Sequence, residues 1–552
     1  MKRTRKHIEL FAGCGGLCLG LESEGLKLLF ANELSPMAGE TFAYNILGED
    51  LKLLSQNSPP VSAKHTIWLN SRFRSDAVKK RLNENPQDPP LSSERHDERP
   101  LSAIGLSKKL VIGSIVDLND HLEAYPSLGD ELRAMDIDLV SGGPPCQSFS
   151  MAGMRQRDNQ RNQLPWEFAR FVNITRPKIA VLENVTGILH AFQEKDGSAS
   201  RKYYAWHEVA KAFASIEYHP ICLHVNAKYS GVAQNRPRFI MFALRSDVYE
   251  GIRSNPELET VISNSEKFCR AVEANHAVSL EESGLRYWDT SKDAHIFTSR
   301  IFAPFKQFTA PCSSTDKRKH WHTVADAIND FRVSPDPTVN GRYISLLHDS
   351  FRPRRDIEIP KGIDIPNQNN RANGPRVRQR FRLYQVIEKM TPKAKKEVLS
   401  LIKGQITELS EETARLIDKE KFLVAASAGN QKELKLQKLD RHEVTNYVAS
   451  LATKKQTQRA LRATEPAPAA LSIPDDACHY AEELEDIRTL SVREMARIQS
   501  FPDWFTFRSK ETTGGQMRRH QVPQYTQVGN AVPPLLGKAI GKVVNRMLDE
   551  SS

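Results

Sequence analysis

The chain has 552 residues, 39% of them hydrophobic, which is enough for about two to four domains with at least one large core. Lysine and arginine outnumber aspartate and glutamate by 78 to 67, and the net charge of +11 favours a polyanionic partner. The mean hydropathy is −0.50 and no apolar run approaches ~18 residues, so we expect no membrane-spanning segment.

The cysteines and the first residues indicate a cytoplasmic protein. The seven cysteines are scattered, with no CxxC spacing and no His pair at ligand spacing beside them, which predicts a reducing compartment and no structural zinc or other metal. The basic residues 1–6 are followed by Glu9, Glu22 and Glu24 instead of the apolar core of a signal peptide, so we expect no secretion.

The first predicted unit, a strand followed by a glycine turn and a helix, is typical of nucleotide-binding α/β domains. The strand covers residues 7–11, the turn residues 12–16, and the helix begins at Leu17. A second predicted strand ends at Glu33, 20 residues after Gly13, where an acid can accept hydrogen bonds from ribose hydroxyls. This pattern predicts an adenosine-containing cofactor, but it does not separate a dinucleotide from S-adenosylmethionine.

Residues 51–108 differ in composition from their surroundings. They are rich in proline, serine, asparagine and charged residues, which predicts a partly helical insertion outside the core. A third strand is expected at residues 110–115, where the apolar pattern resumes.

A predicted buried strand at residues 137–140 leads to the sequence Gly142-Gly143-Pro144-Pro145-Cys146. The prolines stiffen the turn and the glycines permit close approach of a ligand. The turn therefore holds Cys146 at the carboxyl end of a strand, where ligands bind in open α/β sheets. A small buried cysteine beside a tight turn remains the alternative.

Two further motifs carry charged residues. Glu183 follows a predicted buried strand at 178–182, so its carboxylate can project toward the turn at Cys146; a surface salt bridge is the alternative. Residues 234–238 place Arg236 and Arg238 around a proline, either in an ordinary basic hairpin or directed at a base or phosphate. Residues 151–163 predict a basic loop that lies at the surface or closes over a substrate.

The second half of the chain shows no nucleotide-binding pattern until its end. Residues 246–480 are basic and charged with helical spacing of apolar residues, which predicts a separate, largely helical or mixed domain. Ser491 and Glu494 fit a capping box at the start of a helix, and a final helix is expected at residues 535–548.

Six stretches follow one another in the order found in a known family: residues 11–16, 142–147, 183–185, 234–238, 488–497 and 527–533. The sequence resembles the DNA (cytosine-5) methyltransferases, most closely the prokaryotic enzymes of restriction–modification systems. The clearly similar stretches, 1–48, 110–245 and 471–541, cover 255 of the 552 residues. Several motifs in a fixed order are far more specific than any one of them.

The resemblance implies a doubly wound, Rossmann-like α/β methyltransferase domain with a second, smaller target-recognition domain. The catalytic and cofactor-binding domain is then expected at residues 1–245, including the insertion 51–108, and target recognition at 246–480. Residues 481–552 form a return segment, of which 524–552 complete the catalytic domain.

The resemblance also implies the cofactor and its contacts. S-adenosylmethionine is expected to bind through Phe11, Gly13, Gly15, Gly16, Glu33, Ile115, Leu164 and Asn530. One position departs from the family pattern, because Ser114 stands where an acid often contacts adenine, and Asp117 is not at the matching place.

By the same resemblance, Cys146 is the nucleophile, Glu183 the acid partner, and Arg236 and Arg238 hold the target cytosine. C5 of cytosine is a poor nucleophile, but thiolate addition at C6 gives an enamine whose C5 can accept a methyl group. Hydrogen bonding or protonation at N3 by a carboxyl favours the addition. The base must first be flipped out of the duplex, at a cost of roughly a few kcal/mol.

The expected substrate is double-stranded DNA, bound by a monomer in a prokaryotic cytoplasm, with a cognate restriction endonuclease as a possible partner. Three alternatives remain: an RNA cytosine-5 methyltransferase, a non-catalytic DNA-binding accessory protein of the same fold, and a dehydrogenase with a catalytic cysteine. The long region 246–480 favours DNA over RNA, and intact Cys146 and Glu183 disfavour an accessory protein. A dehydrogenase leaves the arginines and the segment at Gly529 unused.

Overall fold

The computed structural model describes residues 4–88, 90, 95–96, 102–145, 163–196, 199–311, 315–316, 319–339, 341–354, 358, 360, 364–427, 430–453, 458–469, 474, 477–514, 517 and 520–551. Cys146 and residues 151–162 of the predicted basic loop lie outside these ranges.

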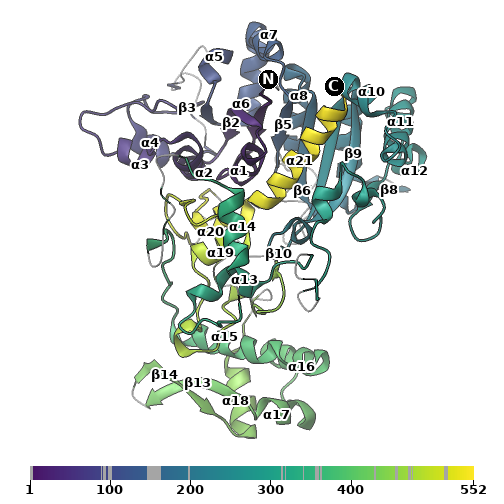
Figure 1. The fold of residues 1–552 in the computed structure, drawn as a ribbon. Coiled ribbons are helices and arrows are strands. Elements are labelled where there is room, and N and C mark those ends of the chain that lie inside the picture. The colour runs from purple at the N-terminus through teal and green to yellow at the C-terminus, as the bar shows by residue number, and fades with distance from the viewer. Residues whose placement is uncertain are drawn as a thin grey trace.

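The centre of the molecule is a nine-stranded sheet in the order β12-β9-β11-β6-β5-β1-β2-β4-β3 (Figure 1). Its strands are β1 (Lys6–Leu10), β2 (Lys27–Glu33), β3 (Thr66–Trp68), β4 (Lys109–Ile112), β5 (Leu139–Gly142), β6 (Ile179–Val185), β9 (Tyr218–Asn226), β11 (Pro237–Arg245) and β12 (Tyr287–Asp289). Neighbouring strands are parallel except at β11, which runs antiparallel to both β6 and β9. This sheet confirms the predicted α/β fold.

Both faces of the sheet are buried, as alternate residues of its strands show. Along β11, Ile240 and Phe242 pack in one hydrophobic cluster, whereas Phe239 and Met241 pack in another on the opposite face. The first cluster includes α1 (Gly16–Ser23) and α21 (Pro534–Glu550). The second includes α6 (Ile115–Ala124), α7 (Pro126–Ala134), α8 (Leu164–Thr175) and α9 (Ala205–Ala214). Helices on both faces make the sheet doubly wound.

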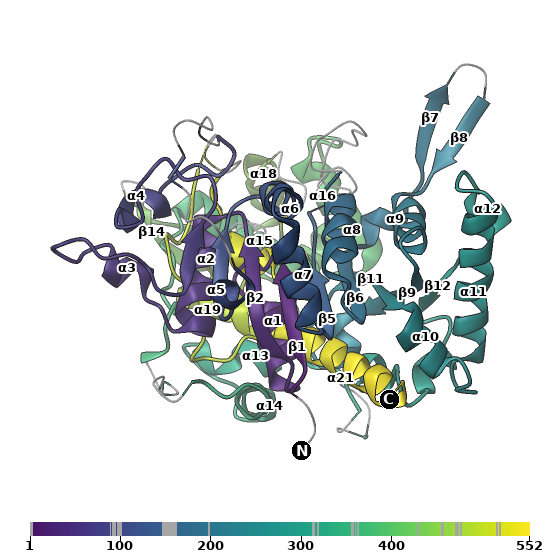
Figure 2. The same cartoon turned by 90° about the horizontal axis from the view of Figure 1, so that it is seen from above.

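The remaining helices surround this body or build the small domain. Around the sheet lie α2 (Pro36–Phe42), α3 (Leu51–Leu54), α4 (Val78–Leu82), α5 (Ala103–Leu106), α10 (Ser246–Ile252), α11 (Glu259–Ala274), α12 (Leu280–Ser283) and α20 (Gln524–Asn530). On the side of the sheet that faces the small domain, Figure 1 shows α13 (Val324–Ile328), α14 (Arg342–Ser350) and α19 (Val492–Ile498). A hairpin of β7 (Phe192–Asp196) and β8 (Ala199–Tyr203) projects beyond α9 in Figure 2. Within the described ranges, no helix has both the length and the apolar character needed to cross a membrane.

The predicted insertion at residues 51–108 differs from the expectation that it lies outside the core. Its strand β3 pairs with β4 as the edge of the main sheet, and Ile67 and Trp68 are buried there. Trp68 packs with Val78 and Leu110 in a cluster of its own on that edge. Within the described part of this segment, one short apolar strand therefore belongs to the main sheet.

The small domain is narrower than the region predicted from the sequence. Its own hydrophobic cluster extends from Phe381 to Ile487, whereas Trp288 and Phe302 still pack on the main sheet. The predicted boundary at 246 is therefore too early, because β12 adds an edge strand to the sheet after that point. The small domain contains α15 (Pro375–Glu388), α16 (Pro392–Ile402), α17 (Glu411–Ile417), β13 (Lys421–Ser427), β14 (Asn430–Lys438) and α18 (Arg441–Ser450).

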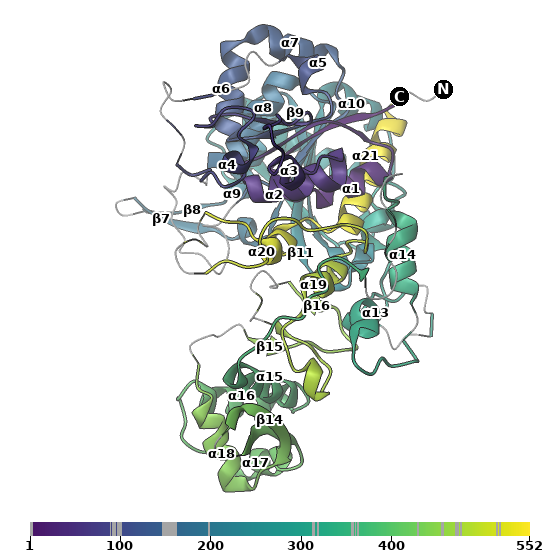
Figure 3. The ribbon, with the colours of Figure 1, turned by 90° about the vertical axis from the view of Figure 1, so that its left-hand side faces the viewer.

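Figures 1 and 3 place the small domain at the end of the molecule away from both termini. Short strands connect the two parts: β10 (Gln234–Asn235) pairs with β16 (Ala467–Pro468), and β15 (Arg459–Ala460) pairs with β17 (Ala477–Cys478). Helix α19 lies between the main sheet and the small domain. It begins at the predicted capping box, which the reciprocal hydrogen bonds of Ser491 and Glu494 confirm.

Candidate active site

The candidate site lies where the parallel strands end. Residues Leu10, Gly142 and Leu182 are aligned across β1, β5 and β6, and Glu33 is aligned with Ile112 across β2 and β4. Because these strands share one direction, their carboxyl ends meet at one edge of the sheet. The glycine turn follows β1 and the proline turn follows β5, and Glu33 and Glu183 lie near the carboxyl ends of β2 and β6.

The glycine turn after β1 is joined to the end of β2 by a carboxylate. The Gly13 amide donates to Glu33 Oε2 at 2.7 Å, and the Ser35 amide donates to Glu33 Oε1 at 2.8 Å. Burial raises the pKa of Glu33, and the backbone hydrogen bonds oppose this change. Gly13 has φ +55° and a Cβ added there would meet nothing within 4 Å. The turn therefore presents its backbone to open space, with Glu33 beside it.

The apolar residues predicted for the cofactor lie around the same edge. Phe11 and Leu164 are half-buried and pack against the cluster that contains the buried Ile115. Ser114 is the N-cap of α6, where its hydroxyl accepts a hydrogen bond from the Val116 amide at 3.2 Å. The position at which the family often has an acid is thus used to start a helix.

Glu183 faces the turn that leads to Cys146. Its Oε1 forms an ion pair with Arg238 Nε at 2.7 Å, and each of these side chains is only 10% exposed. A Cβ added at Gly143 would lie 3.0 Å from Glu183 Oε2. The Asn184 side chain donates to the Pro144 carbonyl oxygen at 3.1 Å, which fixes the proline turn to the end of β6.

Arg236 contacts the C-terminal segment of the chain. Its buried guanidinium donates from Nη2 to the carbonyl oxygens of Gly529 at 3.0 Å and Ala531 at 2.9 Å. Burial and the charge of Arg238 lower the pKa of Arg236, whereas Glu183 opposes this change. Asn530, which lies between the two accepting residues, is exposed. The arginine motif thereby holds the segment that carries Asn530.

Glycines allow the same C-terminal segment to approach α1. A Cβ at Gly16 would collide with the Val532 carbonyl oxygen, and one at Gly20 would lie 2.5 Å from main-chain atoms of Gly537 and Lys538. Gly15 has φ +95°, which favours glycine. Gly16 therefore has a packing role besides any contact with a cofactor.

Three residues that hold elements of the site in place were not predicted from the sequence. Gln527 accepts from Thr41 Oγ1 at 2.6 Å and donates to the Met37 carbonyl oxygen at 3.1 Å, so it ties α20 to α2. Asn184 and Gly20 act as described above. Gln527 and Asn184 lie inside motifs that the sequence resemblance identifies, so their importance could have been predicted. Gly20 lies outside these motifs, and no sequence pattern indicates its role.

A sequence profile described as C-5 cytosine-specific DNA methylase matches residues 5–57, 107–298 and 363–546. The chain belongs to this family. It is therefore a DNA (cytosine-5) methyltransferase, an enzyme that takes a methyl group from a donor and acts on DNA. The family match fits DNA better than the alternative RNA substrate.

The individual relatives of this methyltransferase share less than 30% sequence identity with it in the two examples that follow. The type II methyltransferase M.DdeI of Desulfomicrobium norvegicum is 25% identical over 419 residues, which cover 75% of this chain and 74% of the relative. The type II methyltransferase M.AgeI of Thalassovita gelatinovora is 28% identical over 432 residues, 74% of this chain and 82% of the relative. The crystal structure of the S. pombe Dnmt2 methyltransferase aligns over 99% of both chains, with 11% identity and a TM-score of 0.39.

Proposed function

We propose that the methyltransferase moves a methyl group from S-adenosylmethionine to C5 of a cytosine flipped out of a specific duplex sequence, with Cys146 as the nucleophile. The observation that carries this proposal is the ion pair of Glu183 and Arg238 beside the turn of Gly143 and Pro144. Cys146 follows that turn by two residues.

The cofactor site is proposed at the carboxyl ends of β1 and β2. The open space at Gly13 and the carboxylate of Glu33 suit a ribose, and the half-buried Phe11 and Leu164 suit an adenine ring. Ile115, Gly15, Gly16 and Asn530 complete the proposed set. When bound there, S-adenosylmethionine supplies the methyl group.

The proposed reaction follows from the residues at this edge. The Cys146 thiolate adds to C6 of the cytosine while Glu183 donates a hydrogen bond or proton to N3, and C5 then takes up the methyl group. Arg238 holds the Glu183 carboxyl through its Nε at 2.7 Å. Loss of the C5 proton and β-elimination of the thiolate restore the cytosine ring and the enzyme.

We further infer that the small domain reads the target sequence. Its core is separate from that of the catalytic sheet, and short strands at residues 459–478 connect the two. The relatives M.DdeI and M.AgeI are named as type II methyltransferases. This supports a role as the modification enzyme of a restriction–modification system, acting as a monomer in a prokaryotic cytoplasm on the site of a cognate endonuclease.

The decisive experiment compares Cys146→Ala with the unchanged enzyme. We expect the variant to lose transfer of tritiated methyl groups to DNA and to keep its calorimetric affinity for S-adenosylmethionine, because the thiol is not part of the proposed cofactor site. Transfer at a near-normal rate would refute Cys146 as the nucleophile. Bisulfite sequencing of DNA from cells that express the protein identifies the target site, and its failure to show methylated cytosine would favour a non-catalytic role.

A further inference from the structure

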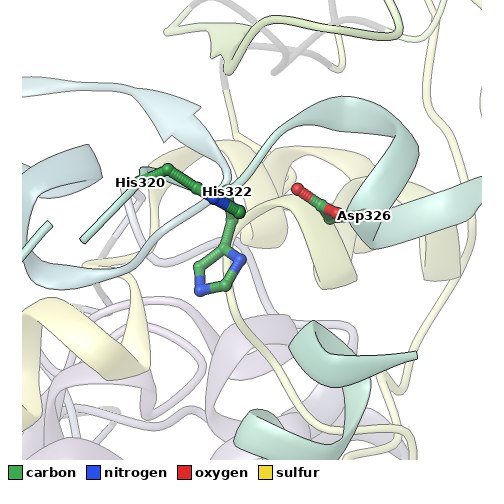
Figure 4. Close-up of side chains that lie close together, drawn as sticks. All are labelled: His320, His322 and Asp326. Atoms are coloured by element: carbon green, nitrogen blue, oxygen red, sulfur yellow. The ribbon is translucent and has the colours of Figure 1, made fainter. Parts of the chain in front are cut away.

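A cluster of two histidines and an aspartate lies at the start of α13, outside the set of residues proposed for catalysis and cofactor binding. One potential ligand atom from each of His320, His322 and Asp326 lies within 4.8 Å of the other two. Figure 4 shows the three side chains close together, with the Asp326 carboxylate on the first turn of α13 directed toward the two histidines. The residues 299–362, which contain this cluster, fall between two stretches matched by the family profile.

The backbone around the cluster fixes all three residues. Ala310 and His320 form a parallel β-bridge, and the Trp321 amide donates to the Ala310 carbonyl oxygen at 2.9 Å. Asp326 is the third residue of α13, and its Oδ2 accepts hydrogen bonds from the amide and hydroxyl of Thr323, both at 2.9 Å. The other carboxylate oxygen, Oδ1, remains for a further ligand.

Ring nitrogens of the two histidines give a second, independent indication of a bound ligand. His320 Nδ1 and His322 Nε2 are both buried, and neither has a hydrogen-bond partner among the described residues. The His322 ring is held against Tyr343 and Phe308, with ring centroids 4.7 and 5.2 Å apart. Buried polar atoms without partners are uncommon and call for an explanation such as a bound ion.

We propose that His320, His322 and Asp326 bind a divalent transition-metal ion, for which Zn²⁺ is the probe. Imidazole nitrogens suit Zn²⁺ and other transition metals, whereas Mg²⁺ and Ca²⁺ prefer oxygen ligands throughout. An ion at the centre of three ligand atoms with this spacing lies at most ~2.8 Å from each, so shifts of about 1 Å reach the usual Zn–N and Zn–O distances. Water takes the fourth tetrahedral position.

The cysteine spacing predicts no zinc site, and the two histidines do not lie beside a cysteine pair. Here the ligands are His-x-His and an aspartate four residues on, and this spacing becomes informative only when α13 turns the carboxylate back toward the rings.

The bound ion would stabilise the junction between the catalytic domain and the small domain. The amides of Val324 and Ala325 donate to the carbonyl oxygens of Glu465 and Ala463, so α13 lies against the chain that returns from the small domain. Tyr343, which packs on His322, donates to the Arg497 carbonyl oxygen at 2.9 Å. A cation at this point therefore links the segment before α13 to the connection between the domains, and its role is structural.

The test uses the full-length protein after removal of metal by a chelator. Isothermal titration with ZnCl₂ is expected to show one tight site in the unchanged protein and in His276→Gln, a control at an exposed histidine elsewhere. We expect His320→Gln and His322→Gln to weaken that site at least about 100-fold, because a direct ligand matters no less than the groups that support it. Co²⁺ bound in place of Zn²⁺ should show d–d absorption without the charge-transfer band of thiolate ligands.

The change in Tm on addition of Zn²⁺ provides a second measurement, which also shows whether each variant is folded. Zn²⁺ should raise the Tm of the unchanged protein and of His276→Gln, but not that of His320→Gln, because an ion that binds only the folded state stabilises it. His322 packs against Tyr343, so His320→Gln decides the outcome if His322→Gln does not fold. Equal zinc stoichiometry and affinity in all four proteins, or no tight site in the unchanged protein, would overturn the proposal.

Discussion

The contact between Arg238 and Glu183 leads to a prediction about how the two residues act together. Arg238 Nε lies 2.7 Å from Glu183 Oε1, and both side chains are buried. We predict that Arg238 acts through the carboxyl, as a positioning residue, in addition to any contact with cytosine. Three variants are needed: Glu183→Gln, Arg238→Lys and the double variant.

The expected magnitudes follow from the kind of interaction removed. Loss of a general acid costs about 10²–10⁴ in rate, so Glu183→Gln should reduce the single-turnover rate by that factor. Arg238→Lys removes a hydrogen bond between charged groups, which is worth about 1.5–3 kcal/mol and corresponds to about 10- to 150-fold in rate. The double variant should be no slower than Glu183→Gln, because the positioning effect disappears with the group that is positioned.

The assay is single-turnover transfer of tritiated methyl groups to duplex DNA at saturating enzyme, with circular dichroism to verify folding. Additive losses in the double variant would refute the reasoning, since they would mean that Arg238 acts on the cytosine independently of Glu183. An unchanged rate for Glu183→Gln would contradict the role of the carboxyl itself.

Three further variants and one control test contacts in the catalytic body. Gly20→Ala should lower the free energy of unfolding by about 1–3 kcal/mol, because its Cβ meets the main chain of α21; Gly341→Ala, which meets nothing within 4 Å, should be close to neutral in the same thermal melt. Arg236→Lys loses the paired donation to Gly529 and Ala531, so calorimetry should show weaker binding of S-adenosylmethionine by about 10-fold or more, and unchanged affinity would contradict the link to Asn530. Asp503→Asn should destabilise the protein by about 1.5–3 kcal/mol, because the buried Arg497 loses one of its two carboxylate partners among the described residues and keeps Asp330; an unchanged Tm would disprove this.

Asp503 also predicts how stability depends on pH. Burial alone would raise its pKa, but the contact with the His348 imidazole and the hydrogen bonds from Arg497 outweigh burial and hold the pKa well below its ordinary value. The carboxylate therefore contributes its full stabilisation above the unfolded pKa of ~3.9, and this contribution is lost as the pH falls toward the folded pKa. Thermal melts between pH 7 and pH 3 should show the loss in the unchanged protein and a smaller one in Asp503→Asn.

The sequence predicts best what depends on neighbouring residues. The strand before Gly13, the carboxylate at Glu33 and the capping box at Ser491 each depend on a few adjacent positions, and the structure has all three elements. The glycine turn and the end of β2 meet as expected, because parallel strands bring their carboxyl ends together. The roles assigned to the site residues stay predictions.

What the sequence does not predict depends on contacts between distant segments. The strand β3 is only three residues long within a polar insertion, so its place in the sheet follows from pairing with β4. The continuation of the catalytic core past residue 246 follows from Phe302 and Phe305 packing on the sheet, which no local pattern distinguishes from a new domain. The contact of Arg236 with Gly529 spans 293 residues along the chain.

The packing of α1 against α21 has a consequence for how the protein is made. The glycine turn leads directly into α1, and the surface behind α1 is completed by Gly537 and its neighbours, more than 500 residues later in the chain. At about 5–20 residues per second, a ribosome needs roughly half a minute or more to add them. The small domain has its own core and can fold while this proceeds. The nascent chain therefore carries an unfinished catalytic core until synthesis is almost over, and a chain cut short before α21 leaves the helix behind the glycine turn uncovered.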